Sequence, residues 1–209
     1  MRCEKHITRC PRPFDTERGK DLSKSFSDLD PSIVEVLTGT AGSSPYLAGL
    51  MERESEWLRA ALFQDPEAVC ASLLSDTRSM AAGDLAAGLR GAKRHVALYT
   101  ALCDLAGIWP LEKVTGTLTE FADIAVDLAI KHFVSTEIER GKLPGATEAD
   151  KDTAGGTAGV AMGKMGGGEL NYSSDSDMNV LFDETIQCAF LCGIEHGTGQ
   201  STCRHDLSG

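Results

Sequence analysis

The sequence has few aromatic residues, no surplus of positive charge and no long apolar run. Its 209 residues include two Trp, three Tyr and seven Phe, and the formal net charge is −11. A surface that binds nucleic-acid phosphates is basic, and single strands stack on aromatic side chains, so nucleic acid is not expected as a partner. No stretch is long and apolar enough to span a bilayer, so a membrane is not expected either.

A regular cysteine pattern and a secretory signal are also lacking. The seven cysteines are an odd number at irregular intervals, which favours reduced thiols over a disulfide framework. The first residues, Met1–His6, are basic, but no apolar core follows them. We therefore expect a cytoplasmic protein.

The first two thirds of the chain predict helices. Hydrophobic residues make up 42% of the sequence, as in a globular protein of one domain or two small ones. Residues 1–30 mix charges with proline and glycine without a period, which predicts a poorly ordered leader. Residues 31–144 form a predicted helical region. Three capping residues followed by proline mark helix starts within it, at Asp30-Pro31, Ser44-Pro45 and Asp65-Pro66.

Three helices of this region can be bounded. The first is expected to end near Leu37. Two long helices follow, because apolar residues recur at steps of three and four from Leu85 to Cys103 and again from Leu111 to Leu128. We interpret both apolar faces as core.

The last third predicts two short strands. Residues 145–157 are rich in small and charged residues and predict a linker. Residues 158–163 form a short apolar run, which predicts a buried strand, and Met178–Phe182 alternates in polarity as a second strand does. The expected fold class is mainly α with a small α+β part.

A glycine-rich stretch with two aspartates lies between these strands. It reads Gly-Lys-Met-Gly-Gly-Gly-Glu-Leu-Asn-Tyr-Ser-Ser-Asp-Ser-Asp over residues 163–177. Glycine lets a backbone approach a phosphate, and Asp175 and Asp177 would project from one face of an extended strand. Two such carboxylates suit a magnesium ion that a phosphate also holds. The pattern indicates phosphoryl or nucleotidyl transfer, the alternative being a turn followed by solvated aspartates. Met165 stands where a Walker loop requires Ser or Thr, so that motif is excluded.

The whole stretch resembles the signature GK-L/M-GG-x-EL-N-x-SSD-x-D of the bifunctional glutamine synthetase adenylyltransferase/adenylyl-removing enzymes. The family's second, C-terminal domain has glycine where this chain has Asn171, so the resemblance points to the N-terminal, adenylyl-removing half. It covers about residues 30–184 and includes the helices before the signature. It implies a truncated chain, in which residues 158–184 begin an incomplete nucleotidyltransferase fold of the polymerase-β-like type.

The resemblance also implies roles for individual residues. Asp175 and Asp177 would be catalytic and hold Mg²⁺, with Asp177 bridging two ions. The remaining candidates would contact nucleotide phosphates: the backbone N–H groups of Gly166 and Gly167, the hydroxyls of Ser173 and Ser174, and the ammonium of Lys164. The serines are equally well explained as caps of the strand entry, and Lys164 as an exposed lysine on a turn.

The reaction that the resemblance implies is phosphorolysis. Inorganic phosphate attacks the adenylyl-tyrosine of modified glutamine synthetase and gives ADP and free tyrosine, while the other half of the family protein transfers AMP from ATP. The implied partners are glutamine synthetase, ATP or ADP, and phosphate, with a nitrogen-status signal-transduction protein as a further candidate. Two alternatives are a non-catalytic helical module that binds glutamine synthetase and a nucleotidyltransferase for another substrate class.

Two further features stay outside this interpretation. Residues 185–209 resemble no part of the family, and Arg204–Asp206 only echoes the context of its third catalytic aspartate, so the chain alone is expected to be weakly active or inactive. Cys188, Cys192 and His196 suggest a zinc site, but their spacing fits no standard pattern, and a random tail is favoured. A basic cluster, Arg90–His95, is interpreted as a solvated helix face, with a docking surface as the alternative.

Overall fold

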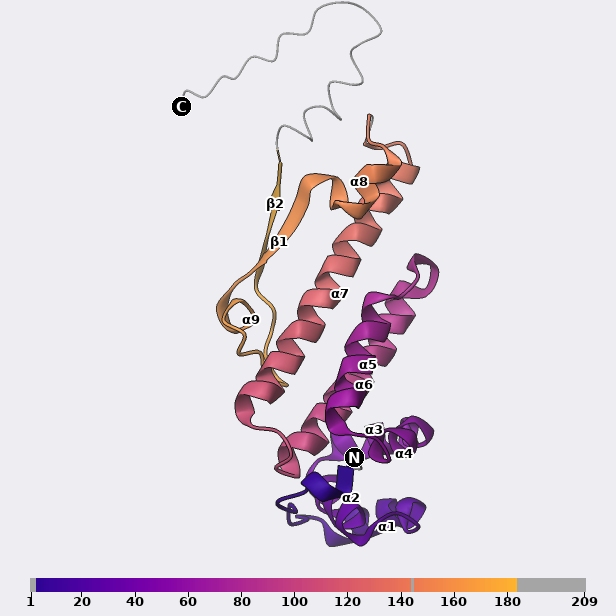
Figure 1. The fold of residues 1–209 in the computed structure, drawn as a ribbon, viewed down its shortest axis with the longest axis vertical. Helices are drawn as coiled ribbons and strands as arrows, with labels where there is room; N and C mark the ends of the chain where they lie inside the picture. The colour runs from indigo at the N-terminus through magenta and orange to yellow at the C-terminus, as the bar shows by residue number, and fades with distance from the viewer. Residues whose placement is uncertain (1–2, 144, 184–209) are drawn as a thin grey trace, which may run out of the picture. The chain divides into compact units, whose positions relative to one another are not determined.

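The structure, a computed structural model, describes residues 3–143 and 145–183 (Figure 1). The chain divides into two compact units. Unit 1 comprises residues 1–125 and 162–176, and unit 2 comprises residues 126–161 and 177–209. Among the described residues, helices predominate and two strands form one antiparallel sheet. The expected class, mainly α with a small β part, is confirmed at this level.

Ten helices and 3₁₀ turns among the described residues lie wholly in unit 1, and α6 is the longest of them. They are η1 (Cys3–His6), α1 (Thr16–Ser23), η2 (Lys24–Phe26), α2 (Pro31–Ser43), α3 (Pro45–Arg53), α4 (Ser55–Leu62), α5 (Pro66–Arg78), η3 (Ala82–Asp84), α6 (Leu85–Leu105) and α9 (Gly163–Gly166). Helix α7 (Leu111–Glu139) begins in unit 1 and continues in unit 2. The two apolar patterns from Leu85 and from Leu111 thus both form long helices, as expected.

The three predicted helix starts are confirmed. In each case the side-chain oxygen of the capping residue accepts a main-chain N–H two or three residues later: Asp30 from Ser32, Ser44 from Leu47, and Asp65 from Glu67. Each bond satisfies one of the N–H groups that a helix start leaves unpaired. The first of these helices, α2, ends at Ser43, so the expected end near Leu37 is wrong.

The expectation of a poorly ordered leader is wrong for much of residues 3–30. Helix α1 lies beside α2 (Figure 1), and Leu22 and Phe26 are buried in the core of unit 1. The main-chain N–H groups of Thr8 and Arg9 donate to the carbonyl of Ala106 at 3.0 and 3.1 Å. We call residues 7–15 the N-terminal strap, because they supply donors to helix ends that lack partners of their own.

The glycines of α2 make room for this strap. A Cβ on Gly39 would lie 1.8 Å from the carbonyl oxygen of Pro11, and one on Gly42 would lie 2.4 Å from the Cβ of Pro13. The N–H of Asp15 also donates to the carbonyl of Gly42 at 2.8 Å. These glycines therefore serve a close approach of two chain segments within a helix, and they do not end it.

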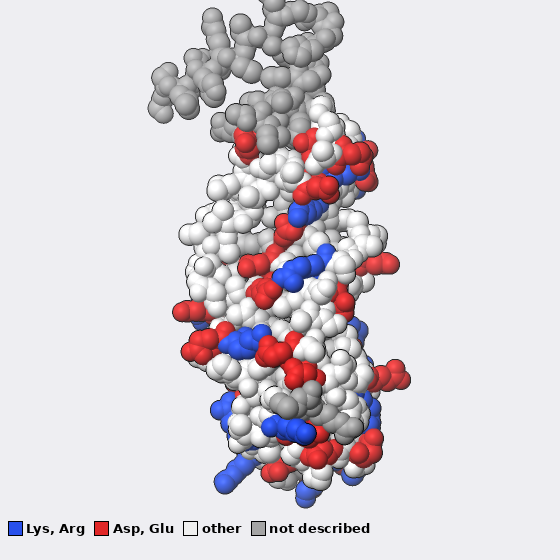
Figure 2. Space-filling view, viewed as in Figure 1, with Lys and Arg blue, Asp and Glu red and all other residues white. Residues whose placement is uncertain are grey.

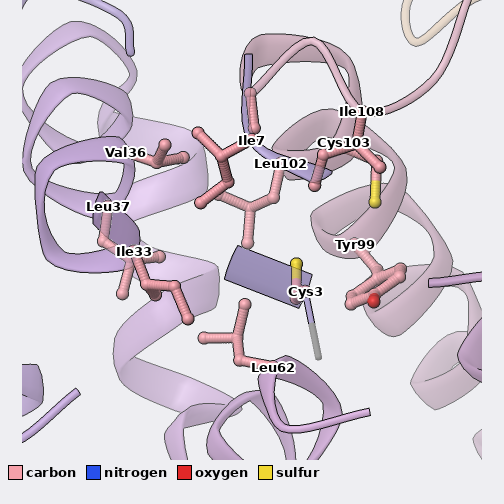
Figure 3. Close-up of a pocket in the computed structure, with 11 residues that line it drawn as sticks. Cys3, Ile7, Ile33, Val36, Leu37, Leu62, Tyr99, Leu102, Cys103 and Ile108 are labelled. Carbon is pink, nitrogen blue, oxygen red and sulfur yellow. The ribbon is translucent and has the colours of Figure 1, made fainter. Parts of the chain in front are cut away.

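The core of unit 1 surrounds a small apolar cavity of about 20 Å³. Its lining comes from η1, α2, α4 and α6, with Cys3, Ile33, Leu62 and Leu102 among the residues drawn in Figure 3. Cys3 and the other cysteines of the described residues are free thiols.

Helix α7 is tied to α5 within unit 1. Lys113 pairs with Glu67 at 2.8 Å, Thr117 contacts the thiol of Cys70 at 3.7 Å, and further along both helices Arg78 pairs with Glu120. Since the partners advance together along both helices, α5 and this part of α7 run in the same direction.

Unit 2 contains the sheet. Strand β1 (Thr157–Ala161) pairs antiparallel with β2 (Met178–Phe182), in a register that places Gly159 opposite Val180. A Cβ on Gly159 would lie 2.9 Å from Cδ1 of Ile130 on α7, so a larger residue there would require the end of that side chain to move. The two strands lie where the sequence predicts them, but the expectation that the first is buried is wrong, because its central residues are exposed.

The predicted linker over residues 145–157 is also more ordered than expected. It holds helix α8 (Glu148–Asp152), the 3₁₀ turn η4 (Ala154–Gly156) and the first residue of β1. Thr147 and Asp150 form a reciprocal capping box at the start of α8. Such a box stabilises even one helical turn by pairing two of its free N–H groups.

Charges on the surface are mixed. On the face shown in Figure 2, acidic and basic side chains of the described residues are interspersed, with no extended basic area. None of the described helices is both long and apolar enough to cross a membrane.

Candidate functional site

Residues 163–177, which we call the glycine–aspartate loop, begin with the single turn α9. Gly163 and Gly168 have φ angles of +57° and +74°, in the left-handed region that favours glycine. The N–H of Gly166 donates to the carbonyl of Met162 at 3.2 Å, and the N–H of Gly167 donates to the carbonyl of Gly163 at 3.0 Å. Both N–H groups thus donate to carbonyls inside the turn, and their contact with a phosphate stays a prediction.

Two buried residues and one hydrogen bond fix the part of the loop that belongs to unit 1, residues 163–176. Met165 and Leu170 are buried. The main-chain N–H of Leu170 donates to Oγ1 of Thr119 on α7 at 3.2 Å, and the Thr119 hydroxyl donates to the carbonyl of Thr115 at 2.9 Å. Sequence reasoning missed Thr119, because a hydroxyl on the buried side of a helix carries no signal of the residue it meets.

A polar turn follows Leu170. Oδ1 of Asn171 accepts the N–H of Ser173 at 3.1 Å, the hydroxyl of Ser173 at 3.3 Å and the hydroxyl of Ser174 at 2.7 Å. The N–H of Ser174 closes the turn on the Asn171 carbonyl at 3.2 Å. Asparagine side chains commonly organise turns in this way. These bonds shape the turn before β2, and the phosphate contacts of Ser173 and Ser174 stay a prediction.

Asp175 and Asp177 precede the second strand and do not lie within it. Strand β2 begins at Met178, opposite Ala161, where pairing with β1 begins. The expectation that both aspartates occupy an extended strand is therefore wrong by one to three residues. Their separation of two positions still limits the distance between their Cα atoms to about 7 Å.

The chemistry of these side chains fits a magnesium ion. Asp175 and Asp177 are exposed, and neither carboxylate has a hydrogen bond or ion pair among the described residues. Mg²⁺ commonly keeps several waters and takes one or two carboxylates together with substrate phosphates. Lys164 is likewise exposed and makes no ion pair within the described part of the chain, so its ammonium is available to a phosphate.

A larger ligand cluster does not form in the part of the chain that the structure covers. Within residues 3–143 and 145–183, no three His, Cys, Asp or Glu side chains come together as a metal site. The suggested zinc residues Cys188, Cys192 and His196 and the echo at Arg204–Asp206 lie outside the described residues.

The basic cluster of α6 is only partly a solvated face. Arg94 and His95 both bind the carboxylate of Glu54, with His95 Nε2 at 2.9 Å. Neither interpretation from the sequence, solvated face or docking surface, holds for these two side chains, because their partner lies within the chain. Arg90 and Lys93 are exposed, as a solvated face requires.

Comparison with known proteins places the loop inside a family. The family model described as glutamate-ammonia ligase adenylyltransferase matches residues 34–198. The chain belongs to this family. The match includes the whole glycine–aspartate loop and confirms the resemblance drawn from its signature. It also extends past Glu184, so the expectation that everything from residue 185 onward departs from the family is wrong up to residue 198.

Several bacterial relatives carry the name bifunctional glutamine synthetase adenylyltransferase/adenylyl-removing enzyme. That of Bradyrhizobium sp. strain ORS 278 is 41% identical over 180 residues, which cover 78% of this chain and 18% of the relative. That of Bradyrhizobium diazoefficiens is 43% identical over 154 residues, 71% of this chain and 15% of the relative. That of Caulobacter vibrioides is 40% identical over 144 residues, which cover 67% of this chain and 15% of the relative.

The chain therefore spans less than a fifth of the length of these relatives. No solved structure matches it.

Proposed function

We propose that this chain carries part of a magnesium-dependent nucleotidyltransferase site that removes AMP from the adenylyl-tyrosine of glutamine synthetase. One observation carries the proposal: Asp175 and Asp177, two exposed carboxylates without partners among the described residues, lie in a glycine–aspartate loop inside the region that matches the family. Two oxygen ligands so close in the chain are suited to a metal that also contacts phosphate.

The proposed reaction is phosphorolysis. An oxygen of inorganic phosphate forms a bond to the phosphorus of the adenylyl group, the bond from that phosphorus to the tyrosine oxygen breaks, and the tyrosine oxygen takes up a proton. The products are ADP and unmodified tyrosine. Asp175 and Asp177 would hold Mg²⁺, which supplies positive charge to the attacking and leaving oxygens of such an in-line displacement. Lys164 would neutralise phosphate charge from the start of the loop.

Asn171 supports assignment to the adenylyl-removing half. Its side chain accepts three hydrogen bonds that shape the turn before Asp175. A glycine at this position, as in the signature of the other half, could accept none of them. We propose that this turn, with its serines, belongs to the removing activity, and that phosphate contacts of Ser173 and Ser174 would exchange with these local bonds.

We also propose a domain arrangement for the chain. Residues 31–144 supply a helical region, and residues 158–184 begin a nucleotidyltransferase fold of the polymerase-β-like type. The order strand, glycine-rich turn, Asp-x-Asp, strand supports it. We propose glutamine synthetase as the protein partner, a nitrogen-status signalling protein as a further one, and the cytoplasm as the compartment.

The test is ADP formation from adenylylated glutamine synthetase, phosphate and Mg²⁺. We expect slow ADP release by the wild-type chain, because no third carboxylate accompanies the pair within the described residues. Release should be lost in the variant Asp175→Asn with Asp177→Asn. Asp152→Asn, which changes an exposed aspartate of α8, is the matched control. Equal release by the wild type and the double variant would contradict the proposal.

A binding assay distinguishes this proposal from the main alternative, a non-catalytic helical module that binds glutamine synthetase. A non-catalytic helical module would bind glutamine synthetase equally well with or without the two aspartates, and no ADP would form with any variant. Our proposal instead ties ADP release to the aspartates, whatever the helices contribute to binding.

A further inference from the structure

We infer that Thr119 is a positioning residue for the proposed site, which holds the glycine–aspartate loop to α7 so that Asp175 is presented in one place. The inference rests on the proposed function, since it concerns how the same loop is held.

The anchor is a buried hydrogen bond between segments 51 residues apart. Thr119 is 6% exposed and Leu170 is 8% exposed. The Thr119 hydroxyl gives its own proton to the carbonyl of Thr115 at 2.9 Å. Its oxygen is thereby oriented and keeps a lone pair with which it accepts the N–H of Leu170 at 3.2 Å. Without this acceptor, the N–H of Leu170 would stay buried and unpaired, which is costlier than losing an exposed bond.

A second threonine of α7 shows what is special about Thr119. Oγ1 of Thr136 donates to the carbonyl of His132 at 2.8 Å, the same bond to the residue four positions earlier that Thr119 makes. No bond from Thr136 to the loop is present in the described structure. The two residues thus share a local helical bond, and among the described bonds only Thr119 also accepts from the loop, although Thr136 is less buried than Thr119.

The anchor acts on the aspartates through the turn at Asn171. Leu170 is followed at once by the turn in which Asn171 accepts from Ser173 and Ser174. The chain from Leu170 to Ser174 is therefore held at its start by Thr119 and internally by Asn171, and Asp175 is the next residue. A loop released at Leu170 would let this whole turn move with the carboxylate that follows it.

The experiment compares Thr119→Val, Thr119→Ser and Thr136→Val in the full chain. Valine keeps the branched shape but removes the acceptor, whereas serine keeps the hydroxyl. Two readouts are taken: hydrogen exchange of the amides over residues 165–172, and binding of Mn²⁺, as a probe for the divalent cation, by electron paramagnetic resonance.

We expect Thr119→Val to speed exchange of the Leu170 amide by about tenfold, the factor that ~1.4 kcal/mol of lost hydrogen bonding gives, and to weaken Mn²⁺ binding severalfold. Thr119→Ser and Thr136→Val should match the wild type in both readouts. Equal exchange in Thr119→Val and Thr136→Val would overturn the anchor. Faster exchange with unchanged Mn²⁺ affinity would overturn the positioning role.

The outcome is separable from that of the proposed function. If the wild type binds Mn²⁺ and the double aspartate variant binds it equally, the metal role of the aspartates fails, while the exchange data still decide whether Thr119 holds the loop. Thermal unfolding of Thr119→Val and Thr136→Val is also compared, because both variants remove the same kind of helical bond. Equal melting temperatures would show that faster exchange in Thr119→Val reflects a local change in the loop.

Discussion

The imidazole of His95 stacks on the indole of Trp57, with ring centroids 4.0 Å apart and planes inclined by 6°. Nε2 of His95 lies 2.9 Å from the carboxylate of Glu54, which Arg94 also binds. Glu54 lies between α3 and α4, whereas His95 and Arg94 lie on α6. One carboxylate therefore joins three helices of unit 1.

Removal of this carboxylate should destabilise the chain. Burial alone would raise the pKa of Glu54, but hydrogen bonds from Arg94 and His95 outweigh burial and lower it below the ordinary value of 4.5. The carboxylate thus contributes stability above pH 4.5, and that contribution is lost as the pH falls through the lowered pKa. We expect Glu54→Gln to lose about 1–3 kcal/mol at pH 7.

Urea unfolding of Glu54→Gln at pH 7 and at pH 3.5 measures this effect. The difference from the wild type should shrink at the lower pH. The control is Glu56→Gln, which changes an exposed glutamate of α4 with no partner among the described residues. A variant at Glu54 as stable as the control at pH 7 would show that the junction does not depend on this carboxylate.

Two glycine-to-alanine changes test the N-terminal strap. At Gly39 a Cβ would lie 1.8 Å from the Pro11 carbonyl oxygen, whereas at Gly49, on α3, nothing lies within 4 Å. Gly39→Ala should therefore cost about 1–3 kcal/mol or more, since the strap must shift. Gly49→Ala should be neutral or stabilising by up to ~1 kcal/mol, because alanine favours a helix. Thermal unfolding compares the two, and similar melting temperatures would mean that the strap does not pack against α2.

The buried thiols should be unreactive in the folded chain. Burial, followed by the nearby charge of Glu4, raises the pKa of Cys3 from 9.0 to about 11, and burial likewise raises that of Cys103. At pH 8 the thiolate of Cys3 should thus be scarcer by about a hundredfold than in the unfolded chain. Alkylation by iodoacetamide, mapped by mass spectrometry, should be at least that much slower at Cys3 before unfolding. Equal rates in folded and unfolded protein would refute its burial.

Asn171→Gly tests the turn before the aspartates. The change removes the acceptor for three donors of Ser173 and Ser174. Because the turn is exposed, we expect overall stability to change by less than about 1 kcal/mol, whereas proteolytic cleavage within residues 171–177 should become faster. Asn171→Asp keeps an acceptor oxygen and should resist cleavage as the wild type does. If both variants are cleaved at the same rate, the side-chain acceptor does not hold the turn.

The sequence predicts best what depends on neighbours in the chain. The caps at Asp30, Ser44 and Asp65 and the strand Met178–Phe182 were predictable, because a capping bond reaches two or three residues and strand alternation is local. Leu22 and Phe26 could not be predicted as core, because α1 and η2 are too short to show a period. The helix that starts at Pro31 continues past its expected end near Leu37, and the close approach of Pro11 to Gly39 joins residues that the sequence does not bring near.

In the candidate site, too, only the features that depend on neighbouring residues could be predicted from the sequence. Asp175, Asp177 and the glycines before them form a contiguous string, so they could be recognised from their order. Thr119 could not, because its bond to Leu170 joins residues 51 positions apart. The bonds of Ser173 and Ser174 to the Asn171 side chain, and those of Gly166 and Gly167 to main-chain carbonyls, could not be predicted either, because they depend on the geometry of the turn.

The central claim is that Asp175 and Asp177 together bind a divalent cation. Titration of the wild-type chain with Mn²⁺, followed by electron paramagnetic resonance, tests it most directly, with Asp152→Asn as control. We predict one class of bound Mn²⁺ in the wild type and in Asp152→Asn, and an affinity at least about tenfold weaker, ~1.4 kcal/mol, in Asp175→Asn with Asp177→Asn. Undiminished binding by the double variant, or no binding by the wild type, would contradict the account.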